Sequence, residues 1–193
     1  GQVGIENLRG MSEFDRSVRT NIYGNIDRTP YYGEEYYSDE KHYSNFIMID
    51  NACNAWVRDV IALHFVRSLV EIRKGAKWVT VQDCTSREPV SRSAGGRRFT
   101  FHVAGQLCLV QRCLSDQGRH SFVGGGQLTC GPNVFLYCRA IRPYGSSEPH
   151  SSLISSTLYD NVVAPISLRF ARNPQGIRWM RINGVLWNCE GMY

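Results

Sequence analysis

The sequence predicts an α+β fold in which two helices precede an antiparallel β-sandwich. Three observations support this prediction. Apolar residues recur at spacings of three and four over residues 1–22, they nearly encircle a helical axis over residues 51–74, and after Gly75 they tend to alternate with a period of two. The first two patterns are typical of helices and the third is typical of strands. Helices followed by a run of strands indicate an α+β protein.

The first expected element is an N-terminal helical arm over residues 1–22. A terminal helix with one narrow apolar stripe must bury that stripe against another surface. The surface belongs either to the same chain or to a neighbouring molecule, and the sequence leaves both alternatives open. Residues 23–193 are expected to form a single α+β domain. The expected contact residues of the arm are Ile5, Leu8, Met11, Phe14, Val18 and Ile22.

A tyrosine-rich, acidic segment follows over residues 23–43. Thr29-Pro30 and Gly33 argue against long regular structure in this segment. We expect either a surface loop anchored by aromatic rings or a segment that contacts another molecule, because tyrosine offers a large contact area at low entropic cost. The tyrosines of this segment are Tyr23, Tyr31, Tyr32, Tyr36, Tyr37 and Tyr43.

The most apolar helix is predicted over residues 51–74. Asp50 or Asn51 is suited to cap its N-terminus, and Gly75 is suited to the position after its C-terminus. Because apolar side chains nearly surround the axis, we expect this helix to be mostly buried with one polar stripe. His64 falls in that stripe and is expected to belong to it rather than to act as a ligand.

Residues 76–193 are expected to form the β-sandwich. The Asn-Gly pair at residues 183–184 predicts a type I′ hairpin near the end of the chain. No internal repeat is recognised in the sequence. The expected strands cover residues 77–84, 97–103, 106–113, 121–123, 133–142, 162–171 and 177–189.

The basic residues are almost all arginines and are concentrated in the second part of the chain. There are 19 arginines and 3 lysines, and the net charge is −4 over residues 1–50 but +9 over residues 51–193. A contiguous patch of such charge would attract polyanions. One hypothesis is therefore a soluble β-sandwich module that binds RNA or another polyanion through arginine-rich strands and turns. A steep dependence of binding on salt would indicate it.

The sequence lacks the motifs of common catalytic and metal sites. It has no P-loop, no G-x-S-x-G, no H-E-x-x-H and, among seven cysteines, no C-x-x-C. We therefore expect no enzymatic activity, no metal site, and buried or reduced thiols. A cysteine-dependent enzyme is the remaining catalytic alternative. The best candidate for an anion site is the glycine turn beside Arg97 and Arg98.

Three features together resemble the polyhedrins of cypoviruses, which crystallise around virus particles in infected insect cells. They are the arm containing Glu6-Asn7-Leu8-Arg9-Gly10, the tyrosine-rich segment, and the long helix that closes with Arg73-Lys74-Gly75 before a β-rich remainder. The resemblance extends from the N-terminus to about Gly75. It implies a structural protein that forms the crystalline matrix of viral occlusion bodies.

The resemblance also implies partners and a location. The chain would form trimers packed in a lattice, with the arm joining neighbouring trimers and virus particles as cargo. It would occupy the host-cell cytoplasm and later the extracellular occlusion body, without a membrane partner. Some polyhedrins bind nucleotides, for which Arg97 and Arg98 are the candidates here, and no other cofactor is implied.

The composition suits a matrix that is stable at neutral pH and dissolves in alkali. Tyrosine, lysine and cysteine titrate in alkali, whereas arginine stays charged. The chain has 10 Tyr, 7 Cys and 3 Lys, so its net charge changes from +5 at pH 7 to −15 once these groups have titrated, above about pH 11. We expect the six tyrosines of residues 23–43 to contribute to this switch, because like charges in a packed lattice repel each other.

Overall fold

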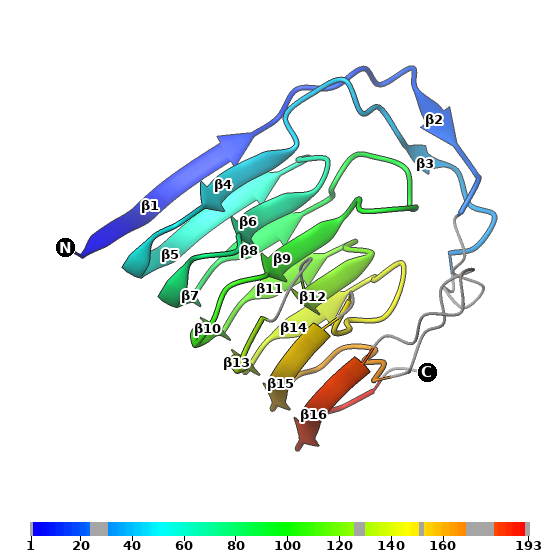
Figure 1. Ribbon diagram of the computed structural model, residues 1–193. Helices are drawn as coiled ribbons and strands as arrows, with labels where there is room; N and C mark the ends of the chain where they lie inside the picture. Colours follow the sequence, from blue (N-terminus) through cyan, green and yellow to red (C-terminus); the bar gives the residue numbers. More distant parts are fainter. Residues whose placement is uncertain (1, 24–30, 126–129, 151–152, 169–179, 192–193) are drawn as a thin grey trace.

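The computed structural model describes residues 2–23, 31–125, 130–150, 153–168 and 180–191 of the chain (Figure 1). All regular elements of these residues are β-strands. Both helix predictions are therefore wrong: β1 (Val3–Met11) occupies the place of the arm, and β5 (Cys53–Leu63) and β6 (Ser68–Ile72) that of the long helix. In the described ranges, no helix has the length and apolar character that crossing a bilayer requires.

The strands stack in parallel to form a β-solenoid, which replaces the predicted antiparallel sandwich (Figure 1). One turn contributes a strand to a four-stranded sheet and two strands to a ten-stranded sheet, and the next turn repeats this order. The three central turns consist of β6, β7 (Lys77–Gln82) and β8 (Thr85–Arg87); β9 (Phe99–Val103), β10 (Cys108–Gln111) and β11 (Leu114–Asp116); and β12 (His120–Gly124), β13 (Asn133–Leu136) and β14 (Arg139–Ile141).

Further strands extend the stack at both ends. β4 (Asn45–Ile49) pairs with β6 in the four-stranded sheet, and β1 pairs with β5. At the other end, β15 (Leu153–Asp160) and β16 (Met180–Trp187) follow β13. The predicted hairpin at residues 183–184 is wrong, because both residues lie within β16, which runs parallel to β15. Among the described residues the single antiparallel pair is β2 (Arg19–Thr20) with β3 (Tyr36–Tyr37).

A six-residue motif that the sequence predictions did not include repeats from turn to turn. Its third residue has a positive φ and forms a kink, as in Asn7, Asp59, Asp83, Arg112, Tyr137, Asn161 and Asn188. In the central turns the first, fourth and sixth residues of the motif point into the core. In register, the copies are residues 5–10 (IENLRG), 57–62 (VRDVIA), 81–86 (VQDCTS), 110–115 (VQRCLS), 135–140 (FLYCRA), 159–164 (YDNVVA) and 186–191 (LWNCEG).

The kink explains why the apolar pattern predicts helices in segments that form strands. The buried residues of β5 are Ala55, Val57, Val60 and Ala62, at spacings of two, three and two. A flat strand would continue with a strict period of two, but the left-handed residue Asp59 shifts the inward face by one position. The resulting spacings approximate the 3.6-residue period of a helix. The same kink in β1 accounts for the helix-like spacing of the apolar residues in the expected arm.

The core lies between the two sheets and contains a column of cysteines. Cys84, Cys113 and Cys138 occupy the position after the kink in three successive turns, and Val60 and Val162 occupy it in the turns on either side. The three cysteines are buried thiols rather than disulfides. A cysteine here acts as a small apolar side chain that stacks on its equivalents.

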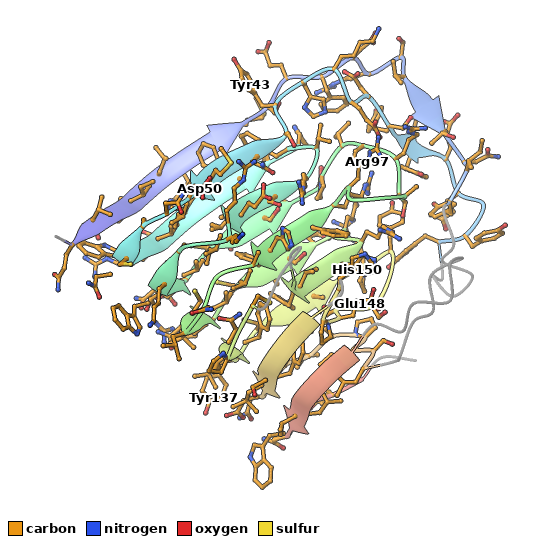
Figure 2. All side chains as sticks on the ribbon, in the orientation of Figure 1. Tyr43, Asp50, Arg97, Tyr137, Glu148 and His150 are labelled. Atoms are coloured by element: carbon orange, nitrogen blue, oxygen red, sulfur yellow. The ribbon has the colours of Figure 1, made fainter. Side chains whose placement is uncertain are left out.

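The kink also supports a prediction about Tyr137. This residue has a φ of 51° and an exposed side chain that points away from the ribbon (Figure 2). A left-handed backbone costs a residue with a branched or bulky side chain about 1–2 kcal/mol, whereas asparagine tolerates it. Tyr137→Asn is therefore expected to raise the free energy of unfolding by about 1 kcal/mol in urea denaturation. Tyr137→Ala keeps the β-carbon and should give no such gain; equal effects of both changes would contradict the explanation.

Candidate ligand-binding groove

A groove of about 790 Å³ borders the four-stranded sheet and is the candidate site. Strands β6 and β9 supply its floor, and the residues that follow β4, β6, β9 and β12 supply its edges. The parallel stacking of turns brings together side chains that are far apart in the sequence. The lining residues are Asp50, Asn51, Arg67, Glu71, Arg73, Lys74, Gly75, Phe99, His102, Ala104, Gly125 and His150.

Glu71 and His102 form the centre of the groove floor. They are directly opposite each other in the register of β6 and β9, so their side chains point to the same face of the sheet. Glu71 Oε1 lies 3.6 Å from His102 Nδ1, and both residues are less than a tenth exposed. The other ring nitrogen of His102 donates a hydrogen bond to the carbonyl oxygen of Gly125 at 2.8 Å. This bond fixes the ring with Nδ1 toward Glu71.

Three neighbours hold Glu71 as a carboxylate. Asn45 Nδ2 donates to Glu71 Oε2 at 2.7 Å, and the guanidinium groups of Arg67 and Arg73 lie 3.5 and 3.8 Å from Oε1. The close contact with the His102 ring and the charges of Arg67, His102 and Arg73 keep the pKa of Glu71 below its ordinary value, although burial acts in the opposite direction. The groove therefore has a fixed negative charge at its floor, surrounded by cations.

The rim of the groove is basic. Arg73 and Lys74 follow β6 directly, and Lys74 is exposed to solvent. The positive charge of Arg73 is partly neutralised, because its Nη1 lies 3.8 Å from Asp50 Oδ2. An anionic ligand would therefore meet two cationic side chains at this end of the groove.

A cluster of His120, Glu148 and His150 lies at the other end of the groove. Phe99 joins the two regions, since its ring is edge-on to both His120 and His150, with centroids 5.1 and 5.2 Å apart. Glu148 Oε1 lies 2.7 Å from His150 Nδ1, and the two labelled side chains are adjacent in Figure 2. Burial lowers the pKa of His120 to about 4, so its ring is neutral at pH 7.

Glycine at position 125 allows this end of the groove to close tightly. The amide of His150 donates to the carbonyl oxygen of Gly124 at 2.6 Å, which places residues 148–150 along the end of β12. Gly125 has a φ of 150°, and a β-carbon there would overlap the carbonyl oxygen of His150. A larger residue would displace both the Gly125 carbonyl bonded to His102 and the segment that contains His150.

The two arginines predicted to bind a nucleotide lie outside the groove. Arg98 is 1% exposed, and its guanidinium lies over the rings of Tyr36 and Tyr144, 4.9 and 4.7 Å from their centroids. The Arg97 side chain is about one-third exposed and pairs with Glu40 at 2.9 Å. Burial makes Arg98 a structural residue that is inaccessible to a nucleotide, and nucleotide binding at Arg97 stays a prediction.

The six predicted alkaline-switch tyrosines divide into different environments. Tyr23 and Tyr36 are buried against Tyr144, Tyr31 and Tyr37 are half-buried, and Tyr32 and Tyr43 are exposed. Burial, with the nearby phenols of Tyr144 and Tyr36, raises the pKa of Tyr23. Burial also raises the pKa of Tyr144, which sequence analysis did not select. Part of the tyrosine-rich segment therefore packs with Tyr144 around Arg98.

The expected contact residues of the arm are mostly at the surface. Ile5, Leu8 and Met11 lie on β1 and are 38–61% exposed, and Val18 and Ile22 are 40% and 74% exposed. Phe14 is the exception, because its ring packs against Tyr37, His42 and His64. Contact of the five exposed residues with another molecule stays a prediction.

The groove residues are not predictable from local sequence patterns, because their proximity depends on strand register. Glu71 and His102 are far apart in the sequence, and Glu71 lies within residues 51–74, for which the sequence predicts a helix. The repeated motif was the available signal: once copies 57–62, 81–86 and 110–115 are aligned, the chain must return to an equivalent position with each copy. That recurrence indicates a solenoid, and side chains on equivalent strands then become neighbours.

No family model, no curated protein and no solved structure matches this chain.

Proposed function

We propose that this protein binds an acidic polysaccharide in the groove beside the four-stranded sheet. The observation that supports this function is a basic rim, Arg73 and Lys74, around a floor that contains the ionised Glu71 with Arg67 and His102. Sugar carboxylates fit the arginines, because a guanidinium matches a carboxylate with two parallel hydrogen bonds. Sugar hydroxyls fit the acidic groups, because Glu71 and Asp50 accept hydrogen bonds.

The groove suits a sugar chain better than RNA. Single-stranded nucleic acids need aromatic faces on which bases stack. The aromatic residue of the groove, Phe99, is only 4% exposed, and its ring is surrounded by His120, His150 and the guanidinium groups of Arg67 and Arg119. The positive charge after residue 50 supports polyanion binding in general, and the mixed charges of the groove favour a hydroxyl-rich ligand.

Assembly into an occlusion-body matrix is the other candidate and stays a prediction. Two of the three features that resemble polyhedrins were helices, and strands occupy both places. The tyrosine-rich segment is the remaining feature. Its Tyr23 and Tyr36 pack within the chain, so they give no support to contacts between chains. The groove therefore provides the stronger basis for a function.

The test is calorimetric titration with oligogalacturonates of increasing length at two salt concentrations. We expect saturable binding that weakens as salt increases. Arg73→Ala/Lys74→Ala should weaken it at least tenfold, or about 1.4 kcal/mol. The matched control is Arg87→Ala/Arg139→Ala, which removes two exposed basic residues from the ten-stranded sheet and should leave the affinity within twofold.

Three results would contradict the proposal. They are the absence of binding to acidic oligosaccharides, equal loss in the rim and control variants, and tighter binding of RNA than of oligogalacturonate at the same salt concentration. A neutral oligosaccharide of the same length separates recognition of carboxylates from recognition of the sugar backbone, and it should bind at least tenfold more weakly.

A further inference from the structure

We propose that His120, Glu148 and His150 bind a divalent transition-metal ion, for which zinc is the representative. Each side chain offers one ligand atom, and the three atoms lie within 4.8 Å of one another. Two histidines and one carboxylate are a common protein ligand set for zinc. This inference does not depend on the proposed polysaccharide ligand.

His120 provides the strongest argument, because one of its ring nitrogens is buried without a hydrogen-bond partner. The residue is 5% exposed, and its Nδ1 donates to the carbonyl oxygen of Ser146. When a carbonyl oxygen accepts a hydrogen bond from one ring nitrogen of a neutral histidine, the proton is on that nitrogen and the lone pair is on the other. Metal-binding histidines are commonly oriented in this way. Nε2 of His120 makes no hydrogen bond among the described residues, although it is excluded from solvent. A bound metal ion would satisfy this nitrogen.

The separations of the ligand atoms suit one tetrahedral ion. Bonds of 2.0–2.1 Å place two ligand atoms of such an ion roughly 3.3 Å apart. Glu148 Oε1 lies 2.7 Å from His150 Nδ1 and 3.9 Å from His120 Nε2, so the two separations bracket this value. Small side-chain rotations would bring all three atoms to bonding distance. Binding would replace the contact between Glu148 and His150, with loss of the proton between them.

The types of ligand atom indicate which ion would bind, and the exposure of His150 indicates how the ion would enter. Two imidazole nitrogens and one carboxylate favour zinc and similar transition ions over calcium or magnesium, which prefer oxygen ligands. The His150 side chain is 44% exposed and lines the groove, so an ion could enter from that side. Three protein ligands leave the fourth position of a tetrahedral ion for water or for an anionic ligand.

The test titrates the full chain, after removal of metals by a chelator, with Zn²⁺ in a calorimeter and with Co²⁺ in an absorption spectrometer. We expect one ion per chain with a Kd in the micromolar range or below. Co²⁺ should produce the intense visible bands of a tetrahedral site. His150→Ala and Glu148→Gln should each weaken binding at least 100-fold and abolish the Zn²⁺-induced rise in Tm. Both side chains are less buried than that of His120, which lowers the risk of misfolding.

The matched control is His64→Ala. His64 also lies near a glutamate, with its Nε2 3.7 Å from Glu88, but it is not part of a three-ligand cluster among the described residues. Its replacement should leave Zn²⁺ affinity unchanged. The proposal is overturned if Zn²⁺ binds no tighter than millimolar, if His150→Ala and Glu148→Gln retain binding, or if Co²⁺ shows the ultraviolet charge-transfer band of thiolate ligands from Cys53 or Cys189.

Discussion

Replacing Arg98 by methionine is expected to lower the free energy of unfolding by about 3 kcal/mol or more. The three guanidinium nitrogens donate to the carbonyl oxygens of Ser91, Gln117 and Tyr37 at 3.0, 3.4 and 3.2 Å. Methionine fills a similar volume but leaves these buried acceptors unpaired, each at a cost of about 1 kcal/mol or more. The cation–π contacts with Tyr36 and Tyr144 would also be lost.

Urea unfolding monitored by tryptophan fluorescence and near-ultraviolet circular dichroism measures this effect. Arg97→Ala is the control at the adjacent position, where the side chain is partly exposed and its loss should cost about 1 kcal/mol or less. Arg98→Lys retains the charge but cannot reach three carbonyls, so it should resemble Arg98→Met more than wild type. Equal stabilities of Arg98→Met and Arg97→Ala would show that the buried guanidinium does not hold the tyrosine-rich segment.

Stability is expected to decrease steeply as pH rises above about 9. Burial raises the pKa of Cys108 to about 11 and, with the nearby Cys108 thiol, that of Cys130 to about 12, against 9.0 for an exposed thiol. Between these values the folded state keeps a proton that the unfolded chain has released, so rising pH favours unfolding. One unit of pKa shift corresponds to about 1.4 kcal/mol in the free energy of unfolding. Each thiol therefore contributes roughly 3–4 kcal/mol to this free energy below pH 9, and the contribution is lost by pH 11–12.

Urea midpoints at pH 8, 10 and 11 test this prediction. Cys108→Ala/Cys130→Ala should reduce stability at pH 8 but make its pH dependence clearly shallower. Cys53→Ala, which removes an exposed thiol, should leave the pH dependence unchanged. A wild-type midpoint that stays constant to pH 11, or a double variant that loses stability as steeply as wild type, would contradict the assignment. Cys113, Tyr23 and Tyr144, whose pKa values burial also raises, would account for a residual slope.

Strand positions could be predicted from the sequence where the repeat is least disturbed. The expected strand over residues 77–84 contains β7, the one over 97–103 contains β9, and the one over 106–113 contains β10. Alternation identified β7 and β10, in which every second side chain is buried, whereas all five residues of β9 are buried. Their parallel pairing was not predictable in the same way, since partner strands are separated by a whole turn of the solenoid and share no local signal.

The groove and the proposed metal ligands required the three-dimensional register. His120 and Glu148 are far apart in the sequence, and their spacing resembles no recognised metal motif. They become neighbours because residues 148–150 run beside the end of β12. Periodicity over residues 51–74 pointed away from this arrangement, because the kink at Asp59 produced helix-like spacings. Local sequence patterns therefore predict the positions of several strands but not which side chains meet in the groove.

The repeated motif has a consequence for how the chain responds to damage. Each turn contacts mainly the turns before and after it, so its stability is the sum of its own contribution and two interfaces. Loss of β16 removes one interface from β15 and leaves the pairing among β4, β6, β9 and β12 intact. Because contacts are made mainly between neighbouring turns, fraying is confined to the ends of the stack, whereas β6 and β9, which form the groove floor, are inner strands.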